Sequence, residues 1–281
     1  MSEGERHERV AGSPYTPHTP EETDEMLAAV GVDSEADLFD VPSEVRFDGD
    51  LGIESRSERG LRAELTSALA KNDDLTEFLG RDHHSHYVPS VVDDLSQRAE
   101  FLTSYTQYQP EITQGFLQAL FEYQSLVVEL TGLPVANCSM YDAATALGEA
   151  ARLADRVRKV SGSVVWVPEI LHENKRAVLR NYVDGTDLAI ETYPMADGAV
   201  DVDALSELAD GEAAMIYAEN PTVHGTIEAN LSDIGDVADE AGALFCLGTD
   251  TVALGLLEEP ASVGADVVVG EADALGLPTA Y

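Results

Sequence analysis

The stretch "SVVWVPEILHENKRAVLRNY", residues 163–182, shows the pattern that decides the fold. Its first part, residues 163–168, is rich in β-branched and aromatic side chains and predicts a strand. Residues 173–182 space their apolar side chains with the period of a helix. A strand followed directly by a helix is typical of a crossover unit, which joins parallel strands.

The same alternation continues toward the end of the chain. Spacings of about 22 to 30 residues between strands leave room for crossover helices, so the chain predicts an α/β fold with a mostly parallel sheet. The further strands are expected at residues 187–194, 213–221, 243–250 and 265–272, with helices at 201–209 and 230–242. Ligands of such sheets bind at the carboxyl ends of strands. The residues there are Asn220, Pro221, Thr249, Asp250 and Glu271.

The part of the chain before this sheet has a different pattern. Residues 1–14 form a predicted polar tail, residues 15–100 a helical N-terminal segment without a convincing strand, and residues 101–281 a large domain. Thr19 followed by Pro20 predicts a helix start, because a hydroxyl cap and a first-turn proline both favour one.

Two longer helices are expected just ahead of the sheet. One runs from about residue 111 to about residue 130, with Pro110 suited to its first position and Gly132 closing it. The other is expected at residues 145–160, opened by the turn "SMYDAAT". The first is preceded by "TSYTQYQPEITQG", which is dense in polar and aromatic side chains. This stretch is a helix cap, an active-site wall or a partner surface.

The chain is strongly acidic, with 53 Asp and Glu residues against 16 Lys and Arg residues and a formal net charge of −37. An acidic surface repels nucleic acid and anionic membranes, so neither is an expected partner. Either a partner carries a basic patch, or the acidity maintains hydration in high salt, where screening suppresses self-repulsion. The acids are spread along the whole chain, which favours a halophilic source.

The cysteines indicate the compartment. Cys138 and Cys246 lie far apart, which excludes a metal-binding spacing and a disulfide framework. Two free thiols fit a reducing cytoplasm. No apolar run reaches the roughly 18 residues that a bilayer-spanning helix needs. The polar, charged N-terminus does not resemble a secretory signal. A cytoplasmic protein is therefore expected.

Several familiar motifs are absent from the sequence. It contains no phosphate loop of the G-x-x-x-x-G-K-[ST] kind, no G-x-G-x-x-G after a strand, and no G-x-S-x-G elbow. The histidines of "RDHHSHY" (81–87) have no carboxylate or cysteine at a convincing helical spacing, so a polar loop is favoured over a metal site.

Three other places leave two interpretations open. Ser139, Asp142 and Thr145 stand at a predicted helix start, which either binds an anion through its free N–H groups or is simply capped. Asn220 in "AENPTVHGTIE" belongs to a ligand loop or to a plain Asn-Pro turn. Asp250 ends a strand, where it meets a ligand nitrogen or caps a helix.

The order of these features suits a pyridoxal-phosphate enzyme. Such an enzyme places phosphate at a helix start, a carboxylate on the pyridine nitrogen, and a Schiff-base lysine just after the next strand. The lysines are Lys71, Lys159 and Lys175, and none follows the strand at 265–270. Either the cofactor is absent, or another chain supplies the lysine.

Four stretches carry a resemblance to a known family: residues 15–39, residues 86–151, "ENPTVHGTIE" (219–228) and "GADVVVGEADALGLP" (264–278). They resemble the P-protein of the glycine cleavage system, and within that family subunit 1 of the two-subunit glycine dehydrogenase (decarboxylating). The resemblance implies a large domain of the fold-type-I pyridoxal-phosphate transferase kind, preceded by a helical segment.

The resemblance also implies a division of labour between two chains. Subunit 2 carries the lysine and binds pyridoxal 5'-phosphate covalently, whereas subunit 1 is its lysine-free counterpart in a heterotetramer. The assembled glycine dehydrogenase (aminomethyl-transferring, decarboxylating) removes CO₂ from glycine and passes the aminomethyl group to the lipoyl arm of the H-protein.

Site residues carry over one by one. Those that sit where the catalytic subunit grips cofactor are expected to be relics or caps of a degenerate pocket: Ser139, Asp142, Thr145, Asn220 and Asp250. Those expected to form an interface and active-site wall are Tyr105, Tyr108, Gln109 and Glu111.

Two departures from the family pattern stand out. "RDHH" (81–84) replaces a glycine-rich approach to the family's "HY" motif. The printed chain also stops at Tyr281, where the family continues with the last strand of the sheet and a C-terminal small domain. A truncated or split form is therefore expected, with an open sheet edge and low stability on its own.

Three functions follow from this sequence, in order of preference. The first is an enzyme subunit that acts in glycine decarboxylation with its partner. The second is a non-catalytic scaffold or regulatory chain, and the third is an inactive remnant.

Overall fold

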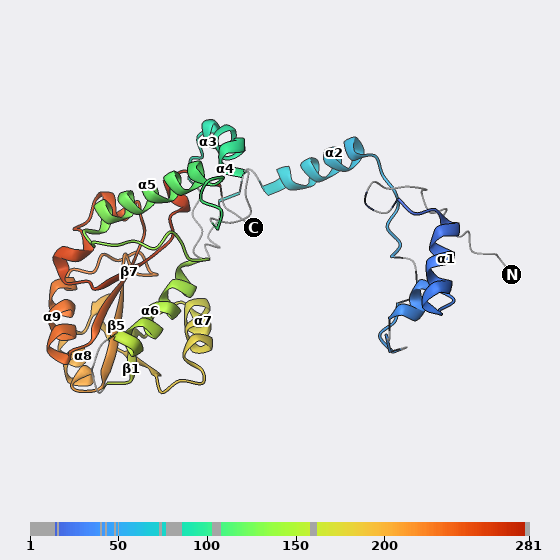
Figure 1. Cartoon of the computed structure of the whole chain (residues 1–281). Helices are drawn as coiled ribbons and strands as arrows, with labels where there is room; N and C mark the ends of the chain where they lie inside the picture. Colours follow the sequence, from blue (N-terminus) through green and yellow to red (C-terminus); the bar gives the residue numbers. More distant parts are fainter. Residues whose placement is uncertain are drawn as a thin grey trace. The chain divides into compact units, whose positions relative to one another are not determined.

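The structure is a computed structural model of the whole chain (Figure 1). It divides into two units, Met1–Glu77 and Phe78–Tyr281. The predicted domain boundary at residue 100 falls inside the second unit, and the predicted tail lies outside the described residues. The structure describes residues 15, 17–39, 41–42, 44–47, 49, 51–72, 75–76, 86–102, 108–157 and 162–278.

The first unit is helical and contains no strand among its described residues. Its first helix begins at the predicted cap. The Thr19 hydroxyl accepts the Glu22 N–H at 3.3 Å, and the Glu22 carboxylate accepts the Thr19 N–H at 2.8 Å. This reciprocal pair satisfies two N–H groups that lack helical partners. The elements are α1 (Pro20–Val30), η1 (Glu35–Leu38), α2 (Glu58–Leu69) and η2 (Ala70–Asn72).

The second unit contains a five-stranded sheet in the order β2-β1-β5-β6-β7, and every pair in it is parallel. The predicted α/β class is confirmed. A short antiparallel pair, β3 with β4, was not expected from the sequence. The strands are β1 (Val164–Pro168), β2 (Ala189–Tyr193), β3 (Met195–Ala196), β4 (Ala199–Val200), β5 (Ala213–Asn220), β6 (Leu244–Thr249) and β7 (Val267–Val269).

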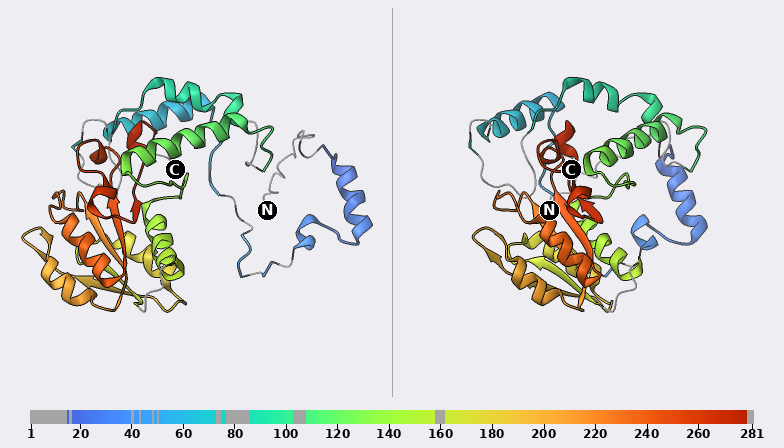
Figure 2. Two further views of the ribbon diagram at one scale, coloured as in Figure 1. Left: turned by 60° about the vertical axis from the view of Figure 1, so that its left-hand side comes forward. Right: turned by 90° about the vertical axis from the view of Figure 1, so that its left-hand side faces the viewer.

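Helices cover both faces of this sheet. The helices α6 and α7 lie on one face and α8 and α9 on the other, as the views of Figures 1 and 2 show. The helices are α3 (Ser90–Ser96), α4 (Ala99–Leu102), α5 (Gln114–Thr131), α6 (Ala143–Val157), α7 (Glu173–Val183), α8 (Val202–Ala209) and α9 (Leu231–Ala241). Short 3-10 turns follow at η3 (Ala253–Gly255), η4 (Pro260–Val263) and η5 (Asp273–Leu275).

The core has two layers because side chains of a strand alternate between its faces. Val165 and Met215 pack in the layer under α6 and α7. Ile216 and Phe245 pack in the layer under α8 and α9. The strands β1, β5 and β6 are buried almost throughout, as central parallel strands are.

Two predicted helix starts are wrong by a few residues. The helix α5 begins at Gln114, so Pro110 lies in the preceding turn and not in the helix. Thr113 closes this turn, because its N–H and its hydroxyl both donate to the Gln109 carbonyl, at 3.1 and 3.0 Å. Gly132, with φ of 69°, ends α5 as predicted. The helix α6 begins at Ala143, before the predicted start.

No helix in the described part of the chain is long and apolar enough to cross a membrane.

Candidate functional site

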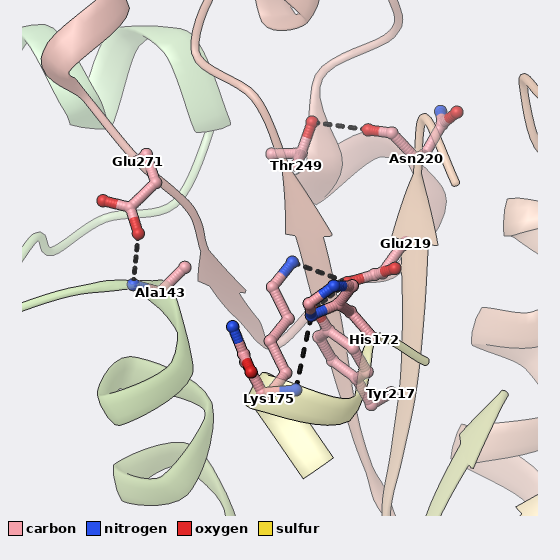
Figure 3. A network of polar contacts seen from close by, with 9 residues as sticks. Ala143, His172, Lys175, Tyr217, Glu219, Asn220, Thr249 and Glu271 are labelled. Carbon is pink, nitrogen blue, oxygen red and sulfur yellow. Dashed lines mark hydrogen bonds and ion pairs between the residues drawn. The ribbon is translucent and has the colours of Figure 1, made fainter. Parts of the chain in front are cut away.

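The carboxyl ends of β5, β6 and β7 bring together polar residues from distant parts of the chain (Figure 3). Asn220 ends β5 and Thr249 ends β6, and the Thr249 hydroxyl donates to the Asn220 carbonyl at 2.7 Å. Glu271 follows β7 and reaches the start of α6. This is the edge of a parallel sheet where ligands usually bind.

The N-terminus of α6 is capped by its own residues. The Asp142 carboxylate accepts the Thr145 N–H at 2.7 Å, and the Thr145 hydroxyl accepts the Asp142 N–H at 3.2 Å. Between the two interpretations left open by the sequence, these contacts fit helix capping. Ser139 lies exposed in the loop ahead of them.

Glu271 adds a second carboxylate at the same helix end. Its Oε1 accepts the Ala143 N–H at 2.7 Å, across 128 residues of sequence. The sequence placed Glu271 at a strand end but gave it no role. Its position just after the run of valines that forms β7 was the available signal.

Asn220 is buried and has structural partners. Its side-chain oxygen accepts the Glu228 N–H at 3.1 Å. The loop that follows closes as a turn, in which the Thr222 N–H donates to the Thr226 carbonyl at 2.9 Å. Gly225, with φ of 79°, supplies a left-handed conformation in this turn. The plain-turn interpretation of this segment therefore fits the geometry.

Asp250 is bound by its own loop. Its Oδ1 accepts the N–H groups of Val252 at 2.7 Å and of Ala253 at 3.2 Å. The contacts are those of a cap at the start of η3. They favour the capping interpretation over a contact with a ligand nitrogen.

A buried ion pair near this edge was not predicted from the sequence. The Lys175 ammonium lies 2.8 Å from the Glu219 carboxylate, and their side chains are 17% and 6% exposed. The Tyr217 hydroxyl donates to the same Glu219 oxygen at 2.9 Å. Burial raises the pKa of Tyr217 well above its ordinary value, and the Glu219 charge raises it further, so the phenol stays protonated and donates.

Gly248 makes room for the Tyr217 side chain, which binds Glu219 of the ion pair. A Cβ at Gly248 would lie 2.1 Å from the Tyr217 hydroxyl oxygen, so a side chain there displaces the tyrosine. From β2, two strands away, the Tyr193 hydroxyl donates to the Tyr217 carbonyl in β5 at 2.8 Å. Lys175, in α7, is thus bound to a carboxylate of β5 and does not belong to the segment after β7.

The residues at this edge do not fit pyridoxal phosphate. A phosphate needs free N–H groups at a helix start, but those of Ala143 and Thr145 are bound by carboxylates. The carboxylate expected to meet the pyridine nitrogen, Asp250, is engaged by its loop. The residues after β7 contain no lysine.

The predicted wall lies partly within the described residues. Tyr105 lies outside them, whereas Tyr108, Gln109 and Glu111 are exposed in the turn before α5. Glu111 also lines an open hollow of ≈ 420 Å³. The rest of its lining comes from Pro110, Gln114, Leu117 and Gln118.

Of the stretch "RDHHSHY" (81–87), which raised the question of a metal site, residues 81–85 lie outside the described ranges and His86 lies within them. Among the described residues, no group of three or more His, Cys, Asp and Glu side chains is arranged to hold a metal ion.

Known structures first define the class of the protein. An apo cysteine desulfurase from Thermococcus onnurineus is similar in fold, with a TM-score of 0.52 at 16% identity over 77% of this chain and 53% of that one. The fold is that of the fold-type-I pyridoxal-phosphate-dependent enzymes.

Sequence comparison then gives the family. Residues 13–281 match the family "Glycine cleavage system P-protein". A protein of Halobacterium salinarum named "Probable glycine dehydrogenase (decarboxylating) subunit 1" is 59% identical over 97% of this chain and 62% of its own length. The crystal structure of an inhibitor-bound glycine decarboxylase (P-protein) is 42% identical, with a TM-score of 0.75 over 94% of this chain and 60% of that one. The chain belongs to the glycine cleavage system P-protein family.

The chain spans about 60% of the length of the relatives that it matches.

Proposed function

We propose that this chain acts as subunit 1 of glycine dehydrogenase (decarboxylating). With subunit 2, in a heterotetramer, it supports the removal of CO₂ from glycine and the transfer of the aminomethyl group to the lipoyl arm of the H-protein. The observation that carries the proposal is the match to the P-protein family over residues 13–281. Relatives named as subunit 1 support the existence of a second subunit.

Pyridoxal phosphate belongs to subunit 2 in this proposal. When bound, the cofactor acts as the electron sink that decarboxylation of an amino acid requires. This chain contributes neither the lysine nor a free helix start, because carboxylates bind the N–H groups of Ala143 and Thr145. Ser139, Asn220 and Asp250 complete a degenerate pocket whose remaining task is structural.

The contribution of this chain is a wall that closes the site of its partner. Tyr105, Tyr108, Gln109 and Glu111 form that wall at the entrance to α5. Exclusion of water by the wall favours decarboxylation, since a carboxylate loses CO₂ more readily when it is desolvated.

The helix α5 supports a subunit interface next to this wall. Thr131 is its single buried residue, although the helix has 18 residues and many of them are apolar. Phe121 and Leu126 remain 64% and 60% exposed, and Ile112 just ahead of the helix is 54% exposed. Large apolar side chains left in water are typical of a surface that a partner covers.

Reconstitution tests the proposal. The chain is mixed with purified subunit 2, and glycine–bicarbonate exchange is measured against subunit 2 alone. Stimulation of exchange is the expected result. Binding without stimulation supports a scaffold or regulatory chain, which the comparisons do not favour. The absence of both binding and stimulation supports an inactive remnant.

The working environment in this proposal is a salt-rich cytoplasm. The excess of 53 acidic over 16 basic residues and the 59% identical relative from Halobacterium salinarum support it. The free cysteines Cys138 and Cys246 suit a reducing compartment. The melting temperature is expected to rise from dilute buffer to molar potassium chloride, because screening relieves repulsion among the acids. A lower melting temperature in molar salt would contradict the proposal.

A further inference from the structure

Glu271 makes a contact that joins the last part of the chain to the start of α6. Its carboxylate accepts the Ala143 N–H at 2.7 Å, and Ala143 is the first residue of the helix (Figure 3). The first N–H groups of a helix have no partner within the helix and carry a partial positive charge. An anion is the natural partner of this position, and here the chain supplies it.

Asp142 completes the occupation of this helix end. It binds the Thr145 N–H at 2.7 Å, so two of the first N–H groups of α6 are bound by carboxylates. Two negative side chains at one helix end outweigh the partial charge of about +0.5 that the helix dipole provides. A phosphate approaching this end meets repulsion and finds two of its donors engaged.

The backbone on both sides of Glu271 is held in place. A Cβ at Gly270 would lie 2.1 Å from the Thr249 carbonyl oxygen, so the chain passes directly against the end of β6. Beyond η5, His86 Nε2 donates to the Leu277 carbonyl at 2.6 Å. The backbone that carries Glu271 is therefore fixed by contacts on both sides of it.

We propose that Glu271 is an internal anion, which fills the N-terminus of α6 and excludes phosphate-bearing ligands from this chain. The inference rests on the proposed function only in explaining why the cofactor is assigned to the partner. It assigns Glu271 the place that a ligand's phosphate takes in proteins whose helix ends are open. Asp142 supports the exclusion by adding its charge.

The test uses inorganic phosphate as the probe and the full chain in molar potassium chloride. Phosphorus NMR titrations compare the wild type with Glu271→Gln, which keeps the shape of the side chain and removes its charge. The wild type is expected to show no saturable binding. Glu271→Gln combined with Asp142→Asn is expected to show saturable binding, with an affinity on the order of tenfold above the weakest that the titration detects.

Controls separate charge removal at this helix from a general change of charge. Glu240→Gln removes an exposed carboxylate from α9 and is expected to behave as the wild type does. Asp142→Asn alone leaves the Glu271 contact in place, and an intermediate gain is expected even if the Glu271 variants fold poorly.

Saturable binding by the wild type, or folded variants with no gain, overturns the inference. The titration contains no subunit 2, so its outcome is independent of the exchange assay that tests the proposed function.

Discussion

The helices α9 and α5 belong to the same unit but differ in how far their apolar residues are buried. In α9, which has 11 residues, Leu231, Ile234, Gly235, Val237 and Ala238 are buried against the sheet. In α5, which has 18 residues, only Thr131 is buried.

The two helices also differ in charge. The sequence of α9, LSDIGDVADEA, places acids on its exposed side, whereas α5 carries only Glu122 and Glu129. In a chain with 53 acidic residues, a long helix so poor in charge is unusual. Interfaces are depleted of charged residues at their centres. The difference supports the proposed interface, in which α9 is completed by its own chain and α5 is covered by subunit 2.

The largest expected effect is a difference in the free energy of unfolding between a variant of α9 and a variant of α5. Ile234 in α9 is fully buried, so Ile234→Ala is expected to lower the free energy of unfolding by about 4 kcal/mol, through lost burial and a cavity. Leu126 in α5 is 60% exposed, and Leu126→Ala is expected to change it by less than about 0.5 kcal/mol in the isolated chain. Urea unfolding in molar potassium chloride measures both. Equal losses would remove the distinction between the helices.

A smaller effect probes how closely α9 lies against its neighbours. A Cβ at Gly235 would lie 2.4 Å from the Val263 carbonyl oxygen, so Gly235→Ala is expected to push α9 away and cost about 2 kcal/mol. Gly255→Ala is the matched control, because a Cβ at Gly255 has no atom within 4 Å. If the two variants unfold at the same urea concentration, α9 is not packed as described.

Assembly provides the next comparison. Phe121→Glu on α5 is expected to weaken association with subunit 2 by about tenfold, roughly 1.4 kcal/mol, because it places a charge in the proposed interface. Leu208→Glu on α8, at a side chain 38% exposed, is the control and is expected to leave association unchanged. Titrating subunit 2 with each variant and following glycine–bicarbonate exchange gives the apparent affinities. An unchanged affinity for the α5 variant would place the interface elsewhere.

The smallest effect concerns the wall itself. Tyr108 is 86% exposed, and Tyr108→Phe is expected to lower the exchange rate of the assembled complex about threefold through loss of one hydrogen bond. The melting temperature of the isolated chain is expected to stay the same. Full exchange activity would leave the stretch before α5 as no more than a turn that leads into a helix.

Most of the sheet was predictable because its information is local. The strands at 164–168 and 213–220 are short runs of apolar residues, and helical periodicity fills the gaps between them. Boundaries were less predictable. Pro110 suits both a first helical turn and the turn before it, and only the double contact of Thr113 with the Gln109 carbonyl decides between them.

The candidate site was predicted in composition but not in pairing. The sequence placed Asp142, Thr145 and Asp250 at element ends, where capping and ligand binding require the same side chains. The contact of Glu271 with Ala143 and the pair of Lys175 with Glu219 join residues far apart in the chain, so no local pattern announces them.

The sequence by itself determined the class of fold, the family, the acidity and the absence of a lysine after β7, because each of these is a property of composition or of short-range order. The tertiary structure decided which groups are engaged. It set carboxylates on the first N–H groups of α6, enclosed Lys175 with Glu219, and left the apolar side chains of α5 uncovered. These outcomes depend on distances between segments, and distances exist only after the chain has folded.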